Sequence, residues 1–113
     1  MDRVAFFKNI ILEVLGEQVS YFAGANIPEI QFVPITDEIH HHYQLVALGW
    51  EGSQRIFNLL YHIDIIGDKI WIQEDHTEDS IAEKLVAKGV SKKDIVLAYF
   101  PDFHRKHTEY AVG

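Results

Sequence analysis

The stretch HIDIIGDKIWIQ, from His62 to Gln73, constrains the fold most strongly, because isoleucines alternate with other residues on both sides of Gly67-Asp68. Side chains alternate between the two faces of a strand, and a two-residue Gly-Asp loop suits a tight hairpin turn. We therefore predict an antiparallel hairpin with a buried isoleucine face. The predicted cross-strand pairs are Ile66 with Lys69, Ile65 with Ile70, Ile63 with Ile72, Asp64 with Trp71, and His62 with Gln73.

Three further strands are predicted around this hairpin. The segment from Ile30 to Ile35 is short and contains Pro34, which cannot donate to a ladder and favours an edge strand. The segment Tyr43 to Trp50 is apolar on both faces, which is typical of a central strand. Residues Ile95 to Phe100 form a last strand or a buried turn. In the strand from Arg55 to Ile66 the alternation predicts one buried set and one polar set. The buried set is Phe57, Leu59, Tyr61, Ile63 and Ile65, and the polar set is Asn58, His62 and Asp64.

Two helices flank the strands. Apolar residues recur every three or four positions from Val4 to Phe22, which predicts an amphipathic helix. A second helix follows a cap at Thr77 or Ser80 and ends at Gly89, a natural left-handed C-cap. The order predicts a single α+β domain over residues 1–113, an antiparallel β-meander packed against an N-terminal helix and a C-terminal helix.

Composition limits the classes of function. The 113 residues include no cysteine, which excludes disulfides and thiolate chemistry, and the formal net charge is -7. The only basic pairs, Lys92-Lys93 and Arg105-Lys106, have acids close by, so we expect no direct binding of duplex DNA and a basic protein partner instead. With no secretory signal and no apolar run of about 20 residues, we expect a cytoplasmic protein with no membrane contact.

The polar side of the hairpin is the candidate site. His62, Asp64, Gln73 and Asp75 are expected within a few side-chain lengths of one another, and a histidine next to carboxylates is suited to acid–base chemistry or to holding a metal. No nucleophile or phosphate loop accompanies them, so the solvated face of a sheet is the simpler interpretation. His40-His41-His42 is interpreted as a solvated strand entry, because only two of the three share a face. No metal and no cofactor are therefore predicted.

Trp71 and Leu60 among these polar residues indicate that something covers this side: a terminal segment, a second subunit or a partner. The C-terminal residues Tyr110, Ala111 and Val112 are expected to dock on the domain or on a neighbour. Our hypothesis is a partner-binding surface rather than a catalytic site. Its predicted members are Asn58, His62, Asp64, Trp71, Gln73, Asp75, Arg105 and Tyr110.

Several stretches together resemble the XisI-like family, the fdxN element excision controlling factor proteins. They are Tyr43-Gln44-Leu45 with Gly49-Trp50, the hairpin HIDIIGDKIWIQ followed by Asp75 and Thr77-Glu78, Ile81-Ala82, Leu85-Val86, Gly89, residues 94–97, and the end from Arg105 through residues 108–112. Ser80 and Ser91 depart from the family pattern, which often has Gly and Pro there.

The resemblance implies a small α+β protein that acts in the programmed excision of a DNA element. It would be an accessory or controlling factor, not the recombinase or another enzyme, and it would work with a companion excision controlling factor protein. We also expect a homo-oligomer. The alternative that the residues leave open is a small metal-binding or acid–base enzyme that uses the polar face of the 55–75 hairpin.

Overall fold

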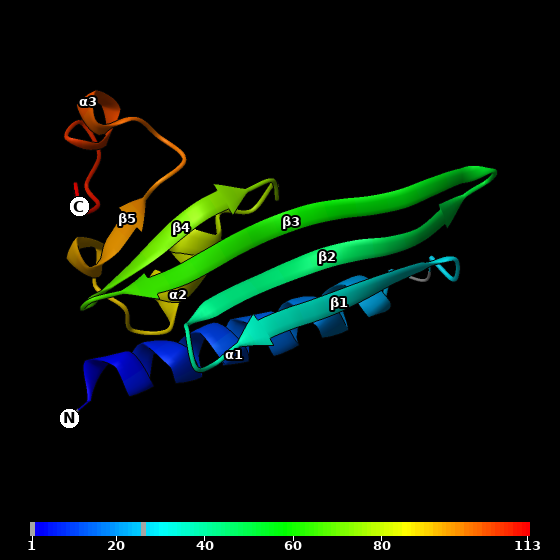
Figure 1. Cartoon of the computed structure of the whole chain (residues 1–113), viewed down its shortest axis with the longest axis horizontal. Helices are drawn as coiled ribbons and strands as arrows, with labels where there is room; N and C mark the ends of the chain where they lie inside the picture. The colour runs from blue at the N-terminus through cyan, green and yellow to red at the C-terminus, as the bar shows by residue number, and fades with distance from the viewer. Residues whose placement is uncertain (1, 26) are drawn as a thin grey trace.

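The structure is a computed structural model that describes residues 2–25 and 27–113. A long helix, α1 (Arg3–Ala23), precedes four strands joined by short turns. After them come helix α2, a single 3-10 turn, a short fifth strand and a last helical turn (Figure 1). The strands are β1 (Ile30–Asp37), β2 (His42–Glu51), β3 (Gln54–Ile66), β4 (Lys69–Asp75) and β5 (Ile95–Leu97), and the later helical elements are α2 (Ile81–Ala87), η1 (Lys92–Asp94) and α3 (Asp102–Arg105).

The sheet follows chain order, β1-β2-β3-β4-β5. The first four strands form the predicted antiparallel meander, and β1 with its Pro34 lies at the edge. Strand β5 is the exception, because it pairs in parallel with β4 over only three residues. The α+β prediction is confirmed.

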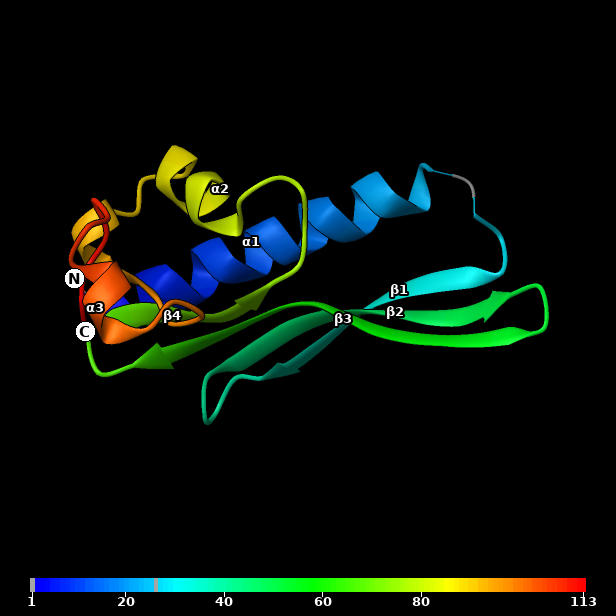
Figure 2. The same cartoon turned by 90° about the horizontal axis from the view of Figure 1, so that it is seen from above.

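Helices α1 and α2 lie on the same side of the sheet (Figure 2), which gives the sheet a covered face and an open face. The covered face and the apolar stripe of α1 form the core. Among its fully buried members are Tyr43, Leu45, Tyr61, Ile63, Ile70 and Ile72 from the sheet, Ile11 from α1, and Leu85 from α2.

The predicted hairpin register is confirmed close to the turn and wrong beyond it. The four pairs from Ile66–Lys69 to Ile63–Ile72 are present. The next pair is His62 with Glu74, not with Gln73, because Gln73 is an extra residue in β4 at a β-bulge.

A second bulge, at Leu60, overturns the predicted faces of the first half of β3. Leu45 pairs with Tyr61 but Val46 pairs with Leu59, so Leu60 has no partner between them. One extra residue inverts the alternation on its far side. Phe57 and Leu59 consequently lie on the open face, and Leu60 packs against the core.

Helix α2 has the predicted ends. The Ser80 hydroxyl accepts a hydrogen bond from the Glu83 N–H. At the other end Gly89 has φ +106°, and the Val90 N–H donates to the Leu85 carbonyl, as in a Schellman motif. Among the described residues, no helix is long and apolar enough to cross a bilayer.

Candidate functional site

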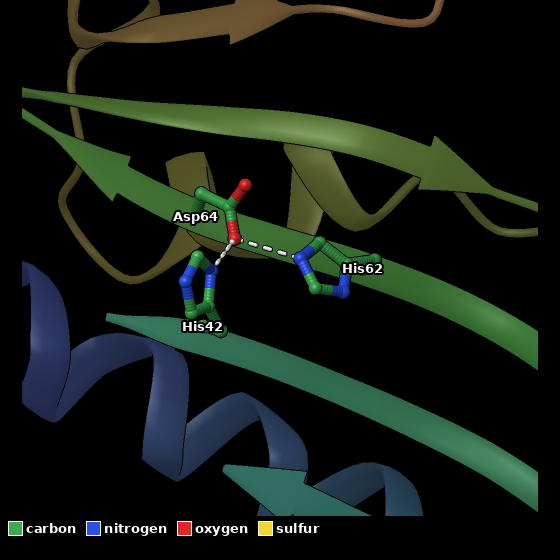
Figure 3. A group of neighbouring side chains, drawn as sticks. All are labelled: His42, His62 and Asp64. Atoms are coloured by element: carbon green, nitrogen blue, oxygen red, sulfur yellow. Dashed lines mark hydrogen bonds and ion pairs between the residues drawn. The ribbon is translucent and has the colours of Figure 1, made fainter. Parts of the chain in front are cut away.

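Three side chains from two neighbouring strands meet on the open face (Figure 3). His42 lies on β2, and His62 and Asp64 lie two residues apart on β3. Asp64 Oδ1 is 2.6 Å from His42 Nδ1 and 2.7 Å from His62 Nε2. The two imidazole rings are 5.9 Å apart between centroids. We call these three residues the His–Asp cluster.

Two amide side chains orient the cluster. Gln44 Oε1, on β2, lies 2.9 Å from His62 Nδ1. Gln73 Nε2, on β4, donates to Asp64 Oδ2 over 3.2 Å. Asp64 therefore has partners on both oxygens, and its side chain is only 13% exposed.

Within the cluster, the pKa of His42 is shifted. The hydrogen bond that His42 donates to the Asp64 carboxylate raises the pKa of the His42 imidazole above its usual 6.5, and the negative charge of Asp37 acts in the same direction. Half of the His42 side chain is exposed, so it can exchange protons with solvent. The arrangement can hold a proton between imidazole and carboxylate near neutral pH, or supply two nitrogens and one oxygen to a metal ion.

Two of the predicted site residues lie on the other face of the sheet, so their assignment to the polar face with His62 is wrong. Asn58 pairs with Ala47 and Asp75 pairs with Tyr61, and both partners belong to the covered face. Asp75 has a structural task there. Its carboxylate accepts hydrogen bonds from the backbone N–H groups of Thr77 and Ile81, which fixes the loop before α2.

Trp71 is half-buried, and the C-terminal segment covers part of it. The Arg105 guanidinium lies 5.6 Å from the Trp71 ring centroid, a cation–π distance. The same guanidinium donates to the carbonyls of Ala98, Phe100 and Val112. Arg105 thus ties the C-terminal residues to the loop after β5. A shallow hollow beside Trp71 is lined by residues of α3 and by Val112 and Gly113.

Tyr110 lies away from the His–Asp cluster and packs against the core. The Lys92 ammonium is 5.8 Å from its ring centroid. Next to it, Ala111 is buried and its N–H donates to the Ile95 carbonyl. The C-terminal residues therefore extend the sheet edge at β5, within the same chain.

Beside the cluster, the open face is apolar. Cross-strand pairs place Val33, Val46 and Leu59 in one row and Leu48 with Phe57 in the next. Phe57 is 66% exposed, and Trp50, at the far end of the same face, is 48% exposed. The Arg55 guanidinium lies 5.2 Å from the Trp50 ring. We call this set of residues the apolar rows.

His42 and Gln44 are the site residues that sequence reasoning missed. A two-residue turn at Gly52-Ser53 with uniform pairing would place His42 opposite Ile63. The bulge at Leu60 moves it by one residue, opposite Asp64. The alternation of β2 already showed that His42 and Gln44 share a face, but only the bulge places that face next to His62.

Comparisons with known proteins agree with this fold. The family model described as XisI protein matches residues 1–112. A XisI-like protein from Anabaena variabilis is similar in structure, with a TM-score of 0.80, 30% sequence identity and coverage of 99% of this chain and 100% of that one. The fdxN element excision controlling factor XisI from the same organism has a TM-score of 0.80, 26% identity and the same coverage. The search of curated proteins found no match.

The match over almost the whole chain confirms the resemblance that the hairpin and the C-terminal residues indicated. The chain belongs to the XisI family.

Proposed function

We propose that this protein is an accessory factor that controls the excision of a DNA element and that acts through protein–protein contacts, not through catalysis. Family membership and the name of one similar structure, an fdxN element excision controlling factor, support the excision role. The apolar rows support the mode of action, because their two exposed members, Phe57 and Trp50, lie among partly buried apolar side chains, and exposed apolar surface of this kind marks an interaction site.

Charge supports a role without direct DNA contact. The net charge is -7, and two of the four residues in the basic pairs, Lys92 and Arg105, are engaged within the chain. Lys92 Nζ lies 2.6 Å from Glu109 Oε2, and Arg105 is held by backbone carbonyls and by Asp102. A protein that grips duplex DNA needs such groups free for phosphates. A basic companion controlling factor is the partner that this charge favours.

We infer that a second copy of the chain covers the apolar rows. The open face has opposite charges at its two ends: Arg55 lies beside Trp50, whereas Asp37 and Asp64 lie at the His–Asp cluster. A twofold axis through the middle of the face would bring each basic end over an acidic end. Self-complementarity of this kind is what an interface between two identical subunits requires.

Light scattering coupled to size-exclusion chromatography tests the assembly. We expect a dimer for the wild-type chain and a monomer for Phe57→Arg, which places a charge in the apolar rows. Tyr21→Arg is the matched control, because Tyr21 is 68% exposed but lies on α1, away from the open face. A wild-type monomer at all concentrations, or a dimer that Phe57→Arg leaves intact, would contradict the dimer.

Excision of the element in a host that lacks its own copy tests the role. We expect the wild-type chain and Tyr21→Arg to restore excision and Phe57→Arg to fail. Co-purification from that host should recover a companion controlling factor with the wild-type chain. Full excision with Phe57→Arg would show that contacts through the apolar rows are not how the protein acts.

A further inference from the structure

We infer that His42, His62 and Asp64 form a binding site for a divalent transition-metal ion of the Zn²⁺ type. The inference does not depend on the proposed role in excision. It rests on the convergence of three ligand atoms from β2 and β3, on the hydrogen-bonding state of His62, and on the two amides behind the cluster.

The distances suit an ion after a small movement. One ligand atom from each residue lies within 4.8 Å of the other two. Zinc–nitrogen and zinc–oxygen bonds of about 2.0–2.1 Å place the ligand atoms of a tetrahedral site roughly 3.3 Å apart. Asp64 Oδ1 is 2.6 and 2.7 Å from the two histidine nitrogens, so it needs to separate from them by only about 0.6–0.7 Å. His42 is half-exposed and has room to do so.

The hydrogen bonds of His62 favour a cation. Its Nδ1 faces the amide oxygen Gln44 Oε1, and its Nε2 faces the carboxylate oxygen of Asp64. Both partners are acceptors, and a neutral imidazole has only one N–H to donate. A ring that donates Nδ1–H to Gln44 has the Nε2 lone pair free for a metal ion. This is the usual state of a metal-binding histidine.

The residues around the three ligands complete the pattern. Gln44 fixes the orientation of His62, and Gln73 fixes the free oxygen of Asp64. Such outer partners typically orient metal ligands. Two imidazoles and one carboxylate suit Zn²⁺, Fe²⁺, Ni²⁺ or Cu²⁺ better than Mg²⁺ or Ca²⁺. Three protein ligands would leave at least one coordination position for water or another ligand.

Zn²⁺ titration of the metal-free full-length chain against a chromophoric chelator tests the inference. We expect one equivalent to bind, and His62→Ala and Asp64→Asn to weaken binding by more than about 100-fold. Gln44→Ala should weaken it by roughly tenfold, as loss of an outer partner does. Co²⁺ gives a second readout. Because the chain has no cysteine, the absorption spectrum of the bound Co²⁺ should indicate only nitrogen and oxygen ligands.

His40→Ala is the matched control. His40 belongs to the same run of three histidines, but its ring pairs with Asp37 at the turn. We expect this variant to bind Zn²⁺ as tightly as the wild-type chain. If His40→Ala abolishes binding while His62→Ala does not, the ion binds to the exposed run and the inference is wrong. Weak binding without a fixed stoichiometry, equal in all variants, would also overturn it. Circular dichroism of each variant separates loss of the site from loss of the fold.

Discussion

Both faces of the sheet carry large apolar side chains, but their surroundings differ. On the covered face Tyr43, Tyr61 and Ile63 are 0% exposed beneath α1 and α2. On the open face Trp50 and Phe57 are 48% and 66% exposed, and no helix of the described part of the chain lies over them. Large apolar residues on the covered face stabilise the fold. Those on the open face add little to the stability of one chain, which is why we propose that a partner surface covers them.

The largest effect is expected from a substitution on the covered face that leaves a cavity in the core. Ile63→Ala removes three carbons from the core and should lower the free energy of unfolding by about 2–5 kcal/mol, since the cavity closes only in part. Phe57→Ala is the matched change on the open face. At concentrations where the chain is monomeric it should stay within about 0.5 kcal/mol of the wild type. Urea unfolding of both variants measures the difference.

An equal loss for Phe57→Ala in the dilute protein would contradict this comparison. It would mean that a segment of the same chain covers the open face in solution.

The next effect concerns Trp71, an aromatic residue of the open face that the C-terminal segment partly covers. Arg105→Ala removes the hydrogen bonds to three carbonyls and should lower stability by about 1.5–3 kcal/mol, as for hydrogen bonds to a charged group. The C-terminal residues should then leave Trp71. In a Trp50→Phe background, the fluorescence of Trp71 should shift to longer wavelength.

Lys106→Ala is the control for Arg105→Ala, because Lys106 is its exposed neighbour in the sequence. It should change neither the stability nor the emission. An unchanged emission after Arg105→Ala would show that Trp71 is covered by something other than the C-terminal segment.

A smaller effect is expected at Tyr61, on the covered face. The Tyr61 hydroxyl is buried without a hydrogen-bond partner among residues 2–25 and 27–113, and burial raises its pKa well above the usual value. A buried polar group without a partner costs free energy. Tyr61→Phe should therefore be neutral or stabilise the fold by about 1 kcal/mol in thermal or urea unfolding. A loss of stability of that size would show that the hydroxyl has a partner.

The sequence was informative where structure is local. The turn at Gly67-Asp68, the alternation of the isoleucines and the ends of α2 follow from residues that are neighbours in the chain. The two bulges do not, because Leu60 and Gln73 have no local property that distinguishes them from regular strand residues. Each bulge shifts every pair beyond it by one residue. For that reason the predicted faces of Asn58, Phe57 and Asp75 were wrong.

The same reason explains why the site was only half predicted. His62 and Asp64 belong to one strand, and their common face follows from the two-residue spacing. The contact of Asp64 with His42 depends on a register that the bulge at Leu60 sets. The parallel pairing of β5 was also beyond reach, since three residues contain too little pattern to give an orientation.

The smallest effect tests how the open face responds to pH. The hydrogen bond to Asp64 raises the pKa of His42, Asp37 adds to the shift, and His62 shares the same carboxylate. A raised pKa in the folded chain means that the protonated imidazole stabilises the fold. This contribution is complete below the unfolded value of 6.5 and is lost as the pH rises through the folded pKa. An NMR titration should therefore show His42 titrating above 6.5, and Asp64→Asn should lower the pKa of His42. If His42 titrates at the same pH with and without the Asp64 carboxylate, the cluster does not form in solution and the open face contains only separate polar residues.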